Sequence, residues 1–230
     1  TSFIMVIAMC IIQSGIIALQ YKAGGSILAS LLPDVFTVES GTFFSFLIFM
    51  LVAVIGGMGS VSLTNVLNLI LIYVGVVLAA VLVLQGHGGW TAIKTLTAAQ
   101  PDVPYLSLTA GMGWIGIISW IIVMLGNTNS VQGVVQIGLT GKDDKAARNG
   151  FIFGALLMVP VGFICAILGV AGRALLPDAS ASMALPMILM SVPPILGGIT
   201  LSGLWAADMG TGCSMIIGLS TTVSKIGRAH

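Results

Sequence analysis

The chain has 230 residues, of which 57% are apolar and only 7% are charged, and its formal net charge is +1. A soluble domain carries about 25% charged residues. This composition, with a mean hydropathy of +1.14, therefore excludes an ordinary water-soluble globule. The near-neutral charge also gives no electrostatic footprint for binding nucleic acid. We expect an all-α integral membrane protein whose solvent is lipid.

Six apolar runs are candidates for membrane-crossing helices, which need about 20 largely apolar residues. None of the runs alternates with the period of two that a barrel strand requires. The predicted spans are residues 1–19, 42–59, 61–84, 106–125, 151–170 and 194–224. Pro193 and Pro194 set the start of the last span, because proline is tolerated in a first helical turn and breaks a helix interior. We expect residues 183–192 to form a short interfacial helix.

Both ends of the sequence suggest an incomplete gene product. Thr1 lies inside an apolar run, without an initiator Met or a targeting segment. Residues 225–230 (KIGRAH) match the translation of a sequencing adapter, and we interpret them as a scar. Residues 1–224 are therefore expected to be one transmembrane domain fragment.

The connection after the fourth span is the most charged part of the chain. It contains Lys142, Asp143, Asp144, Lys145 and Arg148. Lys and Arg divide equally between the two sides of the membrane, so their count alone leaves the orientation open. Because the charges are concentrated in this one loop, we expect it to face the cytoplasm.

Several chemistries receive little support from the sequence. Cys10, Cys165 and Cys213 are scattered through apolar runs, so neither a disulfide framework nor a metal site is expected. Residues 111–116 match GxGxxG, but they open an apolar span instead of following a strand, as a dinucleotide site would require. His87 has no evident orienting acid, so an intramembrane hydrolase is disfavoured. We expect a protein that is not an enzyme.

Asp208 is the only ionisable side chain well inside a predicted span, where an acid costs roughly 2.5–3.5 kcal/mol. Such a residue is a functional candidate, although a hydrogen bond that only packs helices together is the alternative. On a helix, Asp208 and Thr211 lie about 60° apart, and Ala207 and Thr211 about 40°. One helix face would therefore present a carboxylate, a hydroxyl and backbone carbonyls.

This set of oxygens suits a hard, weakly held cation such as sodium. Gly210 and Gly212 would leave neighbouring carbonyls accessible, but a single helix cannot complete such a site. Other polar residues suggest a path between helices: Gln13, Ser14, Asn65, Asn68, Asn127, Asn129, Gln132 and Gln136.

Three segments of the chain resemble the sodium:solute symporter family. Residues 56–65 (GGMGSVSLTN) resemble its glycine-rich turn into a helix, with Asn65 where an acid is usual. Residues 132–150 resemble its charged loop, with Ile137 in place of the usual Arg. The most specific match is residues 194–224, centred on AADMGTGCS at 206–214, with Gly210 in place of the usual Ser.

The resemblance implies a five-plus-five inverted-repeat helical bundle of the leucine-transporter type, of which this chain covers the third to the eighth core helices. It also implies that the Lys142 loop lies inside the cell. Sodium would be held by the carbonyl of Ala207, by the side chains at positions 210 and 211, and by the broken first core helix. Because Gly210 has no hydroxyl, sodium with Asp208 as a substitute ligand fits as well, and so does a proton.

The function that follows is sodium-coupled symport of a small organic solute by alternating access, in the plasma or inner membrane. The partners would be the solute, sodium and membrane lipid, with no cofactor besides the coupling ion. Candidate solute-binding residues are Gln13, Ser14, Trp114, Ser119 and Trp120. The alternative from another class is a membrane sensor or scaffold that shares the fold and does not transport.

Overall fold

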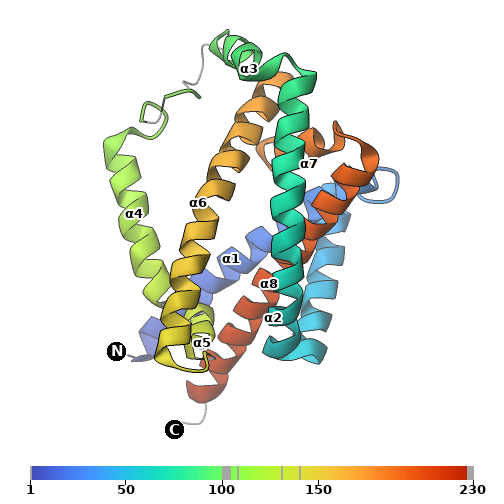
Figure 1. Ribbon diagram of the computed structural model, residues 1–230. Coiled ribbons are helices and arrows are strands. Elements are labelled where there is room, and N and C mark those ends of the chain that lie inside the picture. The colour runs from blue at the N-terminus through green and yellow to red at the C-terminus, as the bar shows by residue number, and fades with distance from the viewer. Residues whose placement is uncertain (1, 100–104, 108, 131, 140, 227–230) are drawn as a thin grey trace.

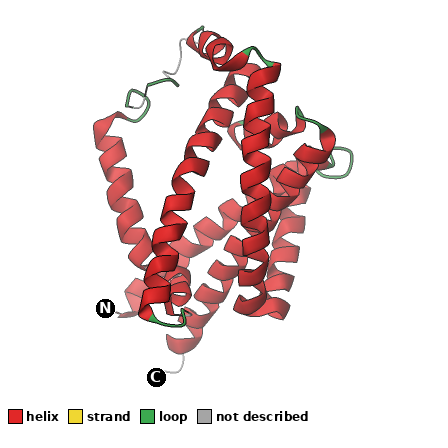
Figure 2. Ribbon diagram, viewed as in Figure 1, coloured by secondary structure: helices red, strands yellow, loops and turns green. Residues whose placement is uncertain are grey.

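A computed structural model describes residues 2–99, 105–107, 109–130, 132–139 and 141–226, in which helices are joined by short loops and there is no strand (Figure 2). The expected all-α fold is therefore confirmed for this part of the chain. The helices are α1 (Ser2–Leu31), α2 (Val38–Gly86), α3 (Gly89–Ala98), α4 (Gly113–Ser130), α5 (Gln132–Leu139), α6 (Asp144–Leu175), α7 (Ala181–Met190) and α8 (Pro194–Ile226).

Within the described residues, four stretches are long and apolar enough to cross a membrane: Ile7–Leu31, Val38–Gly56, Asn65–Gly86 and Asp144–Leu175. α8 is not among these four, because its glycines, its hydroxyl residues and Asp208 lower its hydropathy. The chain is a multi-pass membrane protein, in which most of the outer surface is the apolar surface that lipid covers.

Helix ends follow local sequence signals. Thr37 and Ser40 form a capping box at the start of α2, with Ser40 N donating to Thr37 Oγ1 over 3.2 Å. Asp143 caps α6 by accepting from Ala146 N over 2.6 Å. α8 begins at Pro194, the residue at which the sequence places its start.

Several helices begin at other residues than the predicted spans do; α2 begins at Val38 and α6 at Asp144, before the spans placed at 42 and 151. α4 begins at Gly113 and not at Leu106, because turns precede it and Gly113 has a φ of +67°, outside the helical range. Among the residues whose side chains the structure describes, its apolar part is Gly113–Gly126, shorter than a membrane span. α7 is shifted two residues toward the N-terminus relative to the short helix expected at 183–192.

The 49-residue helix α2 doubles back on itself and has two arms, Val38–Gly56 (the first arm) and Asn65–Gly86 (the second arm). Phe49 lies against Cys213 and Asn65 lies against Gly210, although a straight helix would separate Phe49 from Asn65 by about 24 Å. Both arms therefore pack along α8, as Figure 1 shows. Glycines 56, 57 and 59 lie between them, where a sharp change of helix direction is easiest.

α8 lies at the centre of the bundle and contacts α1 and both arms of α2 (Figure 1). Its first half joins a buried apolar core with the second arm, α6 and α7, which includes Val76, Leu168, Leu189 and Leu201. Its second half contacts a smaller cluster around Phe49 and Cys213. The polar segment of α8 is therefore positioned by apolar packing on either side of it.

α1 and the first arm cross at Gly25 and Gly41, whose backbones touch. A Cβ added at Gly25 would overlap Thr42 Oγ1 and would lie 2.5 Å from Thr42 N and 2.7 Å from Val38 O. A Cβ added at Gly15, on the same helix, would meet nothing within 4 Å. The absence of a side chain at Gly25 is thus what permits this close approach.

We predict that Gly25→Ala destabilises the protein and that Gly15→Ala does not. Both substitutions improve helix propensity by up to about 1 kcal/mol, so their difference isolates the steric cost, about 1–3 kcal/mol for overpacking. Thermal unfolding of the purified variants in detergent measures this difference. Equal melting temperatures for the two variants would contradict the proposed helix crossing.

Candidate functional site

The polar segment of α8 carries two hydroxyl–carbonyl pairs. The Thr211 hydroxyl donates to the carbonyl of Ala207 over 3.1 Å, and the Ser214 hydroxyl donates to the carbonyl of Gly210 over 2.8 Å. Oxygen ligands of a hard cation such as calcium lie about 2.3–2.6 Å from the ion, so both oxygens of one pair can reach the same ion. The segment therefore offers clustered oxygens on one helix face.

Different sides of this segment have different surroundings. Gly210 is buried under Asn65 of the second arm, and Gly212 is buried under Phe49 of the first arm and Gln20 of α1. Thr211 is exposed. The oxygen pairs are thus covered on the side of Gly210 and open at Thr211.

Asp208 is half-buried and lies about 60° around the helix from Thr211. This spacing on a helix directs the two side chains from the same side of α8. Ala207, Asp208, Gly210 and Thr211 are therefore close together because they share one helix segment. Their role in holding an ion stays a prediction.

Ser214 is a member of this group that the sequence analysis did not place in the ion site. It is half-buried, and it repeats the Thr211 arrangement one turn further along α8. The signal in the sequence is the i, i+3 spacing of two hydroxyl residues, each with a small residue four positions before it.

Two side-chain contacts fix the rotation of α8 against the first arm. The indole Nε1–H of Trp205 donates to Ser45 Oγ over 3.1 Å, and the thiol of Cys213 donates to the carbonyl of Phe49 over 3.3 Å. Ser45 and Cys213 are fully buried. The ring of Phe49 also packs on Trp205, with centroids 5.7 Å apart. These contacts lie on either side of the Ala207–Thr211 pair along α8 and orient it.

The predicted solute-binding residues fall into two separate groups. Gln13 is 3% exposed and its Oε1 has no hydrogen-bond partner, while the neighbouring Ser14 lines a cavity of about 500 Å³ between α1, the first arm and α8. Trp114, Ser119 and Trp120 are exposed on α4, which contacts mainly α5 and stands apart from α8 (Figure 1). The structure does not bring the α4 residues to Gln13 and Ser14.

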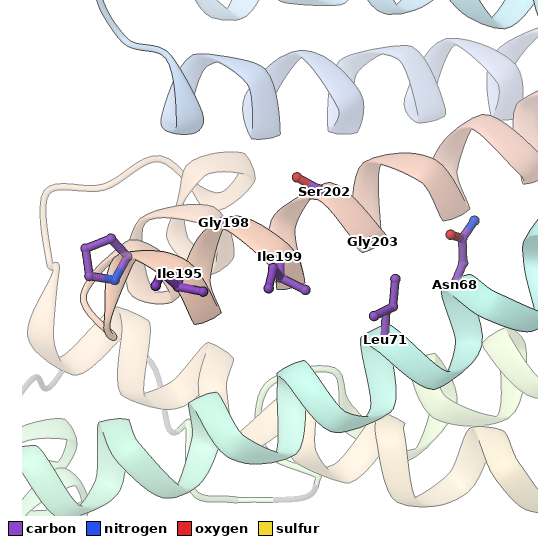
Figure 3. Close-up of a pocket in the computed structure, with 8 residues that line it drawn as sticks. Asn68, Leu71, Ile195, Gly198, Ile199, Ser202 and Gly203 are labelled. Carbon is purple, nitrogen blue, oxygen red and sulfur yellow. The ribbon is translucent and has the colours of Figure 1, made fainter.

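The second arm contributes polar side chains beside α8. Asn68 and Leu71 project toward α8 and line a cavity of about 520 Å³ together with Ile199 and Gly203 (Figure 3). The Asn68 Nδ2 is buried without a hydrogen-bond partner. Asn65 and Asn68 thus lie at the interface between helices, as predicted. The side chains of Asn127, Asn129, Gln132 and Gln136 lie outside the described residues.

No second chemical centre is apparent in the part of the chain that the structure describes. His87 is exposed, with Nδ1 2.9 Å from the carbonyl of Val83, one turn earlier on α2. No group of three or more His, Cys, Asp or Glu residues is placed to hold a metal ion among the described residues. Residues 111–116 run from a turn into the first residues of α4, and no strand stands before them in the described part of the chain. The α8 segment is therefore the candidate site.

Known proteins resemble this chain over most of its length. It is 27% identical over 176 residues to the sodium/pantothenate symporter of Haemophilus influenzae, and 26% identical over 180 residues to that of Escherichia coli. It is 26% identical over 180 residues to the sodium/proline symporter of Staphylococcus aureus. The similarity covers 74% of this chain in each case. The resemblance to the sodium:solute symporter family is confirmed.

These relatives are all named as transporters and none as an enzyme, in agreement with the expectation from the sequence. The chain spans about a third of the length of these sodium:solute symporters, 36% of the two pantothenate symporters and 34% of the proline symporter. No family model matches the chain, and no solved structure does.

We predict that Trp205→Phe destabilises the α8 anchor by about 1–3 kcal/mol, because it leaves the buried hydroxyl of Ser45 without its hydrogen-bond partner. Adding Ser45→Ala to Trp205→Phe should recover part of this loss, because it removes the unpaired group. Thermal unfolding of the two single variants and the double variant measures the coupling. Additive losses would contradict a hydrogen bond between these side chains.

Proposed function

We propose that this chain forms part of a sodium-coupled symporter of a small organic solute, in the plasma or inner membrane, with the Lys142 loop on the cytoplasmic side. The observation that carries the proposal is the pair of oxygens from Ala207 and Thr211, 3.1 Å apart on the central helix of a membrane bundle. The sodium symporters to which the chain is similar support the same function.

The chemistry of the α8 segment suits a cation that must bind and leave in each transport cycle. A carbonyl and a hydroxyl are neutral ligands, so they hold sodium less tightly than a cluster of carboxylates would. Asp208 adds one negative charge beside them. Further oxygens must come from other helices, since one helix face presents ligands to only one side of an ion.

Transport would follow alternating access, with one group of helices rocking against another around this segment. α8 would act as the fixed wall, because it is anchored to the first arm through Trp205 and Cys213. Gln13 and Ser14 of α1 are the stronger candidates for contact with the solute, because they lie in the same bundle as α8. Proline and pantothenate, for which the relatives are named, are the first solutes to test.

Proton coupling through Asp208 is a second candidate function. The observation that favours it is a half-buried carboxylate on the central membrane helix. A carboxylate at this depth is costly to keep charged, so protonation offers an alternative to an accompanying cation.

We predict that Thr211→Val raises the sodium concentration needed for half-maximal solute uptake by about tenfold, because it removes one oxygen ligand and keeps the side-chain shape. Uptake of labelled proline and pantothenate into proteoliposomes containing the full-length protein measures this concentration.

Thr222→Val is the matched control for this experiment. The Thr222 hydroxyl makes the same type of bond, to the carbonyl of Gly218 over 2.9 Å, three turns further along α8. Its removal should leave sodium dependence unchanged. An unchanged sodium dependence in Thr211→Val would remove Thr211 from the ion site, and uptake independent of sodium in the parent would overturn the proposed function.

We predict that Asp208→Asn distinguishes sodium coupling from proton coupling. If sodium drives transport, the variant keeps uptake driven by a sodium gradient, with a raised half-maximal sodium concentration because a negative charge beside the ion is lost. If protons drive transport, it loses uptake driven by a pH gradient. Proteoliposomes with each gradient imposed alone distinguish these outcomes. If the variant takes up solute as fast as the unmodified protein under both gradients, Asp208 has no part in coupling.

A further inference from the structure

Pro160 interrupts the backbone hydrogen bonding of α6. It lies inside the helix, and proline has no N–H to donate to the carbonyl of Leu156, four residues earlier. The proline ring also presses on that carbonyl, which is a common cause of a kink. Because lipid offers no hydrogen bonds, the backbone of a membrane helix that proline opens needs donors from neighbouring helices.

Tyr73 of the second arm supplies such a donor. Its hydroxyl donates to the carbonyl of Leu157, which lies three residues before Pro160 in the same turn of α6. The ordinary helical donor to this carbonyl is the N–H of Val161, the residue directly after the proline. The carbonyl of Leu157 can therefore be satisfied from the second arm as well as from its own helix.

The two halves of α6 on either side of Pro160 are packed differently. In the second half (residues 161–175), Leu168 and Ala171 are fully buried in the core that α6 shares with the second arm and α7. In the first half (residues 144–159), the large apolar side chains are exposed: Phe151, Ile152, Phe153, Leu156, Leu157, Met158 and Val159. The hydrogen bond from the second arm thus reaches α6 on the loosely packed side of the proline.

The second arm is the fixed side of this contact. Val76 and Ala79, three and six residues after Tyr73, are buried. A Cβ added at Gly75 would overlap Thr200 Oγ1, so the second arm and α8 touch there. Tyr73 is therefore held in place by the packing of its own helix on the centre of the bundle.

We propose that Pro160 is a pivot of the transport cycle, and that the hydrogen bond from Tyr73 to Leu157 is a latch that holds the first half of α6 against the second arm. This inference rests on the proposed function, which supplies the cycle and places the Lys142 loop on the cytoplasmic side. With the latch made, the first half of α6 closes this side. With the latch broken, it swings about Pro160 and carries the loop and α5 with it.

Amide hydrogen exchange tests the latch without knowledge of the solute. It is measured by mass spectrometry on the purified full-length protein in lipid nanodiscs, without sodium or solute. Tyr73→Phe should speed exchange at residues 151–159 roughly two- to tenfold, the range for loss of one hydrogen bond, and should leave residues 164–172 unchanged. Tyr105→Phe, which removes a hydroxyl in the turns before α4, is the control and should change neither segment.

Pro160→Ala restores the missing donor and removes the pivot. The variant should melt at a higher temperature, exchange more slowly at residues 151–159 and take up solute more slowly. A proline with a structural role alone would not give a more stable but slower transporter. In this background, Tyr73→Phe should change exchange at residues 151–159 by less than about twofold, because the turn at Leu157 is closed by its own helix.

Uptake of labelled proline and pantothenate into proteoliposomes gives a readout that does not depend on the amount of folded protein. Net uptake requires the empty protein to close its cytoplasmic side, whereas exchange of internal for external solute does not involve the empty protein. Tyr73→Phe should therefore lower the ratio of net uptake to solute exchange roughly two- to tenfold. Loss of folded protein would lower both rates equally and leave this ratio unchanged.

Each outcome bears on one statement. Amide exchange in Tyr73→Phe as slow as in the unmodified protein at residues 151–159 would overturn the latch. Equally faster exchange along the whole of α6 would mean that Tyr73 only packs helices together, and would overturn the pivot. If Tyr73→Phe fails to fold, Pro160→Ala decides, and unchanged uptake in that variant would overturn the inference. Uptake independent of sodium in the unmodified protein would overturn the proposed function, whereas amide exchange at residues 151–159 would still decide the latch.

Discussion

The close approach of α8 to its neighbours is the constraint on which the rest of the structure depends. In lipid, apolar burial provides little force between helices, so contact depends on small residues that let helices meet over a large area. α8 meets the second arm at Gly203 and Gly210, and it meets the first arm and α1 at Gly212. These glycines place the polar segment of α8 between both arms. A side chain at Gly212 would press on the ring of Phe49, and one at Gly210 would displace the Asn65 carboxamide.

The same constraint explains how polar groups are distributed over the bundle. A hydroxyl in lipid needs a hydrogen-bond partner, and Thr211, Ser214 and Thr200 each find one in the carbonyl four residues earlier. Such a bond needs no partner on a second helix, and it leaves the lone pairs of the hydroxyl oxygen available. Trp205 differs, because its indole donates across helices to the buried Ser45. Polar groups on α8 therefore have two roles: some hold the helix in place, and others keep oxygens accessible beside it.

Much of the fold could be predicted from the sequence, because apolar length and proline position act locally. The all-helical character and the start of α8 at Pro194 follow from such signals. The later start of α4 depends on the positive φ of Gly113, which composition does not reveal. Only the part of the site that lies within the single helix α8 could be predicted from the sequence. Spacing places Ala207, Asp208 and Thr211 together, whereas the contact between Asn65 and Gly210 joins residues 145 positions apart and depends on α2 doubling back.

That contact gives a physical meaning to two departures from the family's usual residues. The sequence shows an amide where an acid is usual, at Asn65, and glycine where serine is usual, at Gly210, with nothing in the sequence to connect them. In the structure these two residues touch. Glycine leaves α8 without a side chain at the place where the Asn65 carboxamide reaches it from the second arm, so this side of α8 has an amide contact in place of a hydroxyl. The contact accounts for these residues in terms of packing, because the Asn65 carboxamide fills the space beside the backbone of Gly210.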